Sequence, residues 1–220
     1  MKTKYSQIRE DREINLLIEK GNEILGTLGY TEHSRRHAAR TAETAAQILK
    51  DLGYKKQRIE LAKIAGYMHD IGNVVNRIDH AQSGAVMAFR LLDKIGMDPN
   101  EIALVISAIG NHDESTAAPV NAVAAALILA DKTDVRRSRV RNRNHTAFDI
   151  HDRVNYAVEE SKTYFNSDRT AFVLELTIDT SMCPVMDYFE IFLGRMSLCR
   201  RAAEFLKIRF ELIINGQRIL

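Results

Sequence analysis

Hydrophobic residues recur at helical spacing through most of the first 165 residues of the chain. Over residues 7–28 this spacing predicts an amphipathic helix. A second helix is predicted from a cap at Thr31 to Leu52. A third apolar run leads directly into the pair His69-Asp70, and another helix opens at His80. The first part of the chain is therefore predicted to be a helical bundle.

The helices that follow have clearer boundaries in the sequence. Asp98-Pro99-Asn100-Glu101 places an acceptor at the N-cap, proline at N1 and glutamate at N3, before an apolar run that should end near Gly110. Residues 120–131 are rich in alanine and leucine, which predicts a buried helix with Asp131 at its C-terminal end. A further helix is predicted over residues 149–163.

The pattern changes near residue 165. Alternating apolar positions predict strands over 169–178 and 208–214, and residues 184–206 between them predict an amphipathic helix. Asn215-Gly216 is a hairpin signal, so residues 217–220 are expected to form a short returning strand.

These patterns predict a mainly α protein with a small C-terminal β-α-β appendage. We expect a helical domain over residues 1–165 and a small strand-helix-strand tail over residues 166–220. The tail has no catalytic motif, and roles in packing, in dimerisation or as a lid stay open.

The composition is that of an ordinary globular protein, with 220 residues, 45% of them hydrophobic and 27% charged. Cys183 and Cys199 are too few for a disulfide framework and are expected to be buried thiols. No stretch resembles a signal peptide or a membrane span, so we expect a cytoplasmic protein. The net charge of +2 argues against general attraction to nucleic acid.

One cluster of positive charge follows Asp131 directly. It consists of Arg136, Arg137, Arg139, Arg141 and Arg143. Such runs usually form a solvated surface, but this position raises the prospect that some of these arginines reach substrate phosphates. His145 and His151 have no motif around them and are read as surface residues.

Histidine and aspartate recur at the ends of the predicted helices. His33, His69, Asp70 and Asp131 would supply two imidazoles and two carboxylates from three helices. This set suits a divalent cation and leaves a position open for water. The sequence therefore predicts a metal centre inside the bundle.

The sequence segments around these residues resemble those of the HD superfamily of metal-dependent phosphohydrolases, which are all-helical. The resemblance rests on "YTEHSRRHAARTA", "AGYMHDIGN" and "LILADKTD" in that order and covers about residues 25 to 140. It implies a helical HD domain in which the ligands are His33, His69, Asp70 and Asp131.

Two more histidines extend the resemblance. His80 in "DHAQSGAVMAFRLL" and His112 in "ISAIGNHDES" resemble segments that hold a second metal in some members, and the stretch is similar to the HD domain of ribonuclease Y. One or two divalent ions are implied, and mixed nitrogen and oxygen ligands accept Mn, Fe, Mg, Ni or Zn. His37 shares a helix face with His33, but the family usually has an apolar residue there, which favours a packing or supporting role.

The chain also departs from the family pattern. Asn73 stands where many relatives carry lysine after "HDIG", and Arg77, Lys132, Arg136 or Arg137 could replace the missing charge. Dinuclear relatives often show paired histidines where this chain has His112-Asp113.

The leading hypothesis is hydrolysis of a phosphoester by metal-activated water. The substrate would be nucleotide-like or another small phosphorylated molecule. Asp70 would hold metal and accept a hydrogen bond from the attacking water, while Lys132, Arg136 and Arg137 would stabilise charge on the phosphoryl oxygens.

Two other functions stay open. One is an RNA or cyclic-nucleotide phosphodiesterase. The chain lacks the Gly-x-x-Gly motif of a KH module, so nucleic acid is the less favoured partner. The other is a metal-bound, non-catalytic sensory or assembly domain. In either case the tail could form a homodimer, and no membrane partner is expected.

Overall fold

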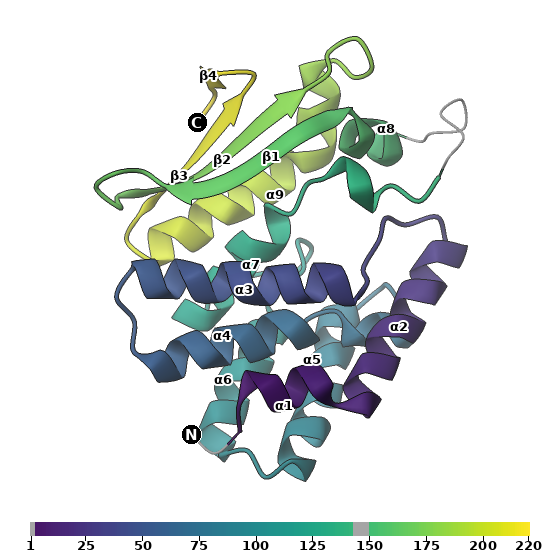
Figure 1. Cartoon of the computed structure of the whole chain (residues 1–220), viewed down its shortest axis with the longest axis vertical. Coiled ribbons are helices and arrows are strands. Elements are labelled where there is room, and N and C mark those ends of the chain that lie inside the picture. Colours follow the sequence, from purple (N-terminus) through teal and green to yellow (C-terminus); the bar gives the residue numbers. More distant parts are fainter. Residues whose placement is uncertain (1–2, 143–149) are drawn as a thin grey trace.

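The computed structural model describes residues 3–142 and 150–220 (Figure 1). The predicted helix over residues 7–28 is two helices, α1 (Tyr5–Glu10) and α2 (Arg12–Thr27). Asp11 separates them, because its extended backbone ends α1 and its carboxylate accepts a hydrogen bond from the backbone N–H of Ile14 at 3.0 Å. The break turns α2 across the end of the bundle, where it packs on the turn after Asp70.

The remaining helices of the bundle enclose one apolar core. They are α3 (Arg35–Asp51), α4 (Lys56–Met68), the 3-10 turn η1 (Ile71–Val74), α5 (His80–Lys94), α6 (Pro99–Gly110) and α7 (Ala122–Lys132). A second 3-10 turn, η2 (Arg137–Arg139), follows α7. Nearly every residue of α7 is buried, which confirms the buried helix predicted over residues 120–131.

Two predicted helix starts had different outcomes. Asp98 caps α6 as expected, with its carboxylate 2.9 Å from the backbone nitrogen of Asn100. The prediction that Thr31 caps the next helix is wrong, since α3 begins at Arg35 and Ser34 is its N-cap. Ser34 accepts a hydrogen bond from the backbone N–H of Arg36, so the nearer hydroxyl satisfies the first turn and Thr31 lies in the preceding loop.

The predicted helix over residues 149–163 is wrong beyond Ala157. Helix α8 (Ile150–Ala157) is followed directly by strand β1 (Val158–Phe165). The run Glu159-Glu160-Ser161-Lys162 has the polarity of an exposed helix face. It forms an edge strand instead, because β1 pairs antiparallel with β2, a distant partner that local pattern does not reveal.

The rest of the tail follows the prediction. Its elements are β2 (Ala171–Ile178), α9 (Val185–Phe205), β3 (Arg209–Ile214) and β4 (Gln217–Arg218). Strands β2 and β3 are parallel, and β3 and β4 form a hairpin at Asn215-Gly216, where both residues have positive φ. Because β1 belongs to the same sheet, the boundary expected at 165/166 falls inside the β1–β2 hairpin. We call residues 158–220 the C-terminal appendage.

Helix α9 joins the appendage to the bundle. It packs against β2 and β3 on one side and against α7 on the other (Figure 1). Cys183 and Cys199 are buried free thiols, as expected. Within residues 3–142 and 150–220, no helix combines the length and apolar character that crossing a membrane would require.

Helices α3 and α4 lie side by side at close range, and Gly66 makes this possible (Figure 1). A Cβ atom at Gly66 would lie 2.7 Å from the Cα of Ala42. We expect Gly66→Ala to lower the free energy of unfolding by about 2 kcal/mol, because the backbone of α3 would have to move. Urea denaturation measures the change.

Gly194→Ala in α9 is the matched control, since a Cβ there meets no described atom within 4 Å. It should leave stability unchanged or raise it by up to about 1 kcal/mol through helix propensity. Equal stability of Gly66→Ala and the unsubstituted protein would show that α3 and α4 can separate without cost.

Candidate metal centre

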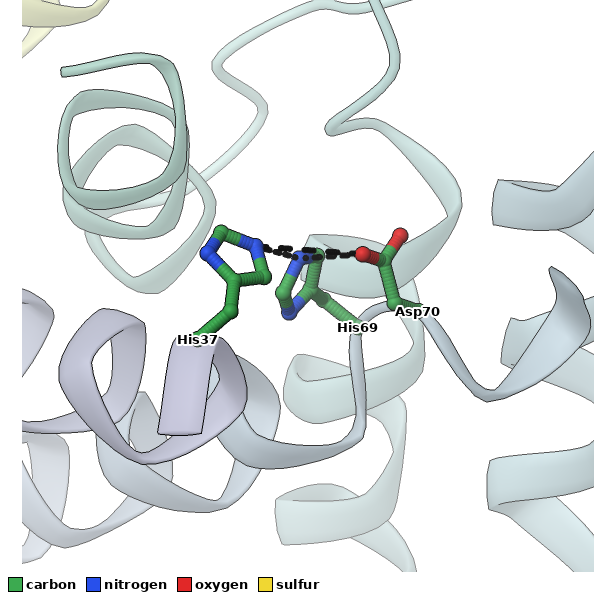
Figure 2. A group of neighbouring side chains, drawn as sticks. All are labelled: His37, His69 and Asp70. Carbon is green, nitrogen blue, oxygen red and sulfur yellow. Dashed lines mark hydrogen bonds and ion pairs between the residues drawn. The ribbon is translucent and has the colours of Figure 1, made fainter. Parts of the chain in front are cut away.

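Helix ends bring six histidines and aspartates together inside the bundle. They are His37 in the first turn of α3, His69 and Asp70 at the end of α4, His80 at the start of α5, His112 after α6, and Asp131 near the end of α7. Figure 2 shows His37 and His69 pointing toward the carboxylate of Asp70. His37, His69, His80 and His112 are at most 2% exposed. These residues form a buried polar centre.

Hydrogen bonds at Nδ1 fix the tautomer of the histidines around this centre. Each Nδ1 faces an oxygen: Thr31 O for His33 (2.7 Å), Gly66 O for His69 (2.8 Å), Arg77 O for His80 (2.9 Å), Ile109 O for His112 (2.6 Å) and Asp134 Oδ2 for His37 (2.7 Å). A carbonyl oxygen only accepts, so Nδ1 carries the hydrogen. In the neutral rings every Nε2 is then a lone-pair atom that can bind a metal.

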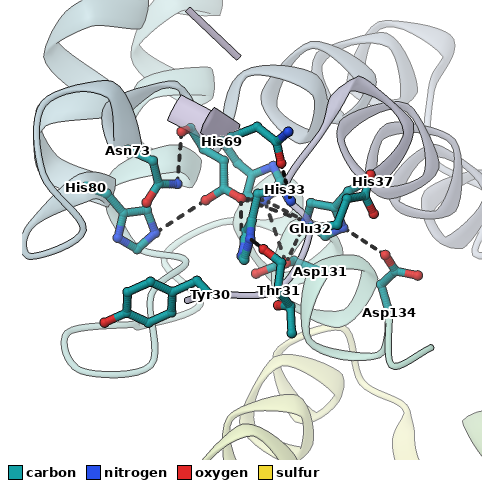
Figure 3. A network of polar contacts seen from close by, with 12 residues as sticks. Tyr30, Thr31, Glu32, His33, His37, His69, Asn73, His80, Asp131 and Asp134 are labelled. Carbon is teal, nitrogen blue, oxygen red and sulfur yellow. Dashed lines mark hydrogen bonds and ion pairs between the residues drawn. The ribbon is translucent and has the colours of Figure 1, made fainter. Parts of the chain in front are cut away.

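These lone pairs meet in two pairs on opposite oxygens of Asp70. Figure 3 shows His37, His69 and His80 among the polar side chains of this centre. His37 Nε2 and His69 Nε2 are 3.3 Å apart and lie 3.8 and 3.2 Å from Asp70 Oδ2. His80 Nε2 and His112 Nε2 are 3.2 Å apart and lie 3.4 and 3.7 Å from Asp70 Oδ1. Two lone pairs at such distances repel each other unless a cation or a proton lies between them.

Asp131 completes the first of these groups. Its Oδ1 lies 3.3 Å from His37 Nε2 and 3.6 Å from His69 Nε2. Asp70 Oδ2 is buried and accepts no hydrogen bond with proper geometry from any residue in the described part of the chain. An orphaned carboxylate oxygen beside nitrogen lone pairs fits a divalent cation. The residues around Asp70 could therefore hold one or two divalent ions.

The pKa shifts of these histidines and of Asp70 agree with a set of cation ligands. Burial lowers the pKa of His80 to about 4 and that of His33 well below its usual range, so both rings are neutral. Burial works against ionised Asp70, yet His69 and His112 hold its pKa well below the usual range. Burial also opposes charge on His69, but Asp70 and Asp131 raise its pKa to about 10. A proton on His69 therefore takes the place of a cation when none is bound.

His33 lies at the edge of this centre and not within it. Its Nε2 is 4.0 Å from Asp70 Oδ2, and it belongs to none of the tight groups of potential ligands among the described residues. The structure thus brings His37, read from the sequence as a supporting residue, to the position expected for His33. The i, i+4 spacing of the two histidines was the available signal, and the usual apolar residue at that position argued against it.

A cavity of about 420 Å³ opens onto the centre. Asp70, His80, His112 and Asp131 line it, as does His33. Its cationic lining residues are Arg77, Lys132, Arg139 and Arg195. The last of these belongs to α9, so the appendage contributes to the cavity wall.

The residues predicted to contact phosphate divide into two groups. Lys132 lines the cavity, and its Nζ lies 2.7 Å from Asp131 Oδ2. Arg136 donates to both oxygens of Asp134, and Arg137 donates to the carbonyl of Tyr156 and stacks on its ring. Neither arginine is among the described residues that line the cavity, because these contacts hold both side chains elsewhere.

Asn73 forms hydrogen bonds with Asp70 of the centre and with a neighbouring arginine. Its side-chain amide donates to the carbonyl of Asp70 at 3.0 Å, and its Oδ1 accepts from Arg77 at 3.3 Å. Arg77 Nη1 also lies 3.3 Å from His80 Nε2. Asn73 thus places a guanidinium near the metal centre. Arg143, His145 and the side chain of His151 lie outside the described residues, so their surface assignment stays a prediction.

Known proteins resemble this chain over more than half of its length. The uncharacterized protein MJ1020 of Methanocaldococcus jannaschii is 27% identical over 160 residues, which cover 62% of this chain and 61% of that protein, less than two thirds of its length. A predicted HD superfamily hydrolase from an uncultured Thermotogales bacterium, known from a crystal structure, is 27% identical. That match covers 57% of this chain and 68% of the other, with a TM-score of 0.45.

The family model of the HD domain matches residues 35–136. The interval includes α3 to α7 and begins after His33, so His37 is the first histidine within it. His69-Asp70 and Asp131 lie in the same interval and meet at the buried centre described above. The chain therefore contains an HD domain, which is built from helices α3 to α7.

Proposed function

We propose that this protein hydrolyses a phosphoester of a small phosphorylated molecule with two divalent cations bound on either side of Asp70. The match of residues 35–136 to the HD domain supports metal-dependent phosphohydrolase activity in general. The observation that carries the proposal is the pairing of histidine lone pairs on opposite oxygens of one buried carboxylate. The volume of the cavity, about 420 Å³, suits a small substrate better than a polymer.

The first cation would be held by His37, His69, Asp70 and Asp131, and the second by Asp70, His80 and His112. Mn, Fe, Mg, Ni and Zn all suit mixed nitrogen and oxygen ligands. When bound, such ions lower the pKa of water toward about 7 and stabilise charge on phosphoryl oxygens. His33 is replaced by His37 in this ligand set and is assigned to the cavity wall.

The chain's own side chains would bind and orient the substrate. Lys132 and Arg77 lie in the cavity wall beside the centre and can donate to phosphoryl oxygens. Asp70 accepts a hydrogen bond from the attacking water, and His33 Nε2 offers a second acceptor at the edge of the cavity. Arg136 and Arg137 are not included, since their contacts with Asp134 and Tyr156 hold them away.

Asp70→Asn tests the activity. It removes the shared charge between the two ligand groups, so Mn²⁺-dependent hydrolysis of p-nitrophenyl phosphate and of a nucleotide panel should fall by more than about 100-fold. Asp93→Asn, an exposed carboxylate on α5, is the control and should keep full activity. Hydrolysis that survives Asp70→Asn, or cleavage of RNA and cyclic nucleotides alone, would contradict the proposal.

His37→Ala and His33→Ala test the ligand assignment. His37 faces both Asp70 and Asp131, whereas His33 approaches only Asp70 from 4.0 Å. We expect His37→Ala to weaken Mn²⁺ binding by more than about tenfold, measured by calorimetry, and His33→Ala to bind Mn²⁺ nearly as the unsubstituted protein does. A larger loss of Mn²⁺ affinity in His33→Ala than in His37→Ala would instead identify His33 as the ligand.

Asp134→Asn tests how His37 is held. The buried Asp134 accepts from His37 Nδ1 at 2.7 Å, and its charge increases the basicity of Nε2. The variant should weaken Mn²⁺ binding by about 10- to 100-fold. Arg40→Gln removes a half-exposed cation 3.0 Å from the same carboxylate and leaves the histidine contact in place. Equal losses in both variants would assign the effect to the ion pairs of Asp134.

A further inference from the structure

Helix α9 carries a cationic side chain from the C-terminal appendage to the wall of the metal-site cavity. Arg195 and Phe192, one helical turn apart, both line the cavity. They lie outside the interval 35–136 that matches the HD domain. The cavity is therefore composite, with the metal centre from the HD domain and part of the wall from the appendage.

The guanidinium of Arg195 is held by two contacts. Its Nε lies 2.5 Å from Glu114 Oε1, and its Cζ lies 4.8 Å from the ring centroid of Phe192. Its terminal amino groups form no hydrogen bond with any residue in the ranges 3–142 and 150–220. A planar guanidinium fixed through Nε and one face keeps a pair of donors for a further anion.

The other arginines of the cavity wall use more of their N–H donors in contacts within the protein. Arg139 is buried and donates to the carbonyls of Glu32 and Asp134. Arg77 donates to Asn73, contacts His80 and lies over the ring of Tyr30. Among the described arginines of the wall, Arg195 thus keeps the most donors for a ligand.

Alternating charges link Arg195 to the metal centre. Glu114 lies between Arg195 and Lys132, and Lys132 Nζ is 3.3 Å from Glu114 Oε2 and 2.7 Å from Asp131 Oδ2. When Asp131 balances a cation, Lys132 and Arg195 share one carboxylate. One positive charge then remains for a ligand.

We propose that Arg195 binds the anionic group of the substrate in the cavity beside the metal centre. It would supply the positive charge that Asn73 does not provide, and the appendage would then be part of the substrate site. The inference rests on the proposed function in one respect, namely that the substrate is phosphorylated. Its chemistry requires only a phosphate-like anion with at least two oxygens free for the guanidinium.

Calorimetry with inorganic phosphate on the Mn²⁺-loaded full chain tests this role without turnover. Arg195→Gln should weaken phosphate binding by about tenfold or more, as expected for loss of a charge-assisted contact. Its Mn²⁺ affinity should be unchanged or higher, because one positive charge near the cations is lost. Arg195→Lys keeps the charge without the paired donors, so its phosphate affinity should lie between those of Arg195→Gln and the unsubstituted protein. Arg200→Gln, on the exposed face of the same helix, should match the unsubstituted protein.

Three results would overturn the proposal. They are undiminished phosphate affinity in Arg195→Gln, a joint loss of phosphate and Mn²⁺ affinity in both Arg195 variants, and no phosphate binding by the unsubstituted protein. A joint loss would mean that Arg195 only supports Asp131 through Glu114 and Lys132. If phosphate binding depends on Arg195 but no phosphoester is cleaved, the anion site stands and the proposed hydrolysis fails.

Discussion

The structure depends on how a buried carboxylate and the surrounding nitrogen lone pairs are stabilised. Asp70 is enclosed by the Nε2 atoms of four histidines, and burial makes an uncompensated group of this kind costly. A divalent cation bound among these atoms would turn the repulsion between the lone pairs into attraction. The arrangement is thus marginal as a protein core and favourable as a metal centre, and the backbone around it holds it together.

Backbone carbonyls at helix ends orient these rings. His69 and His112 each donate from Nδ1 to a carbonyl three residues earlier, in the last turn of α4 and of α6. Carbonyls in a last turn have no partner within the helix, so the histidine satisfies one and receives a fixed tautomer. Gly66 has two roles here, because its carbonyl orients His69 and its lack of a side chain lets α3 bring His37 to the same place.

The sequence predicted well what local patterns control. The cap at Asp98, the buried helix before Asp131, the strand after residue 170 and the turn at Asn215-Gly216 follow from local patterns, and all were confirmed. Several other predictions failed where a contact between residues distant in the sequence decides the structure. Strand β1 forms because β2 pairs with it, and His37 approaches Asp70 because α3 and α4 pack closely. The positions of Arg136 and Arg137 likewise depend on Asp134 and Tyr156, which the order of residues does not place.

The orientation of α9 about its own axis determines which side chain the appendage contributes to the cavity. The parallel strands β2 and β3 require a crossover, and α9 provides it with one side on the sheet and another on α7. Phe192 and Cys199 are buried on this helix, and Arg195 lies between them at helical spacing, so packing of the apolar positions directs its side chain toward the cavity. No described residue of the four strands lines the cavity, yet the sheet packs on α9 and so helps to set where that helix lies. The electrostatics of the cavity wall are therefore coupled to strand pairing in a part of the chain that holds none of the proposed metal ligands.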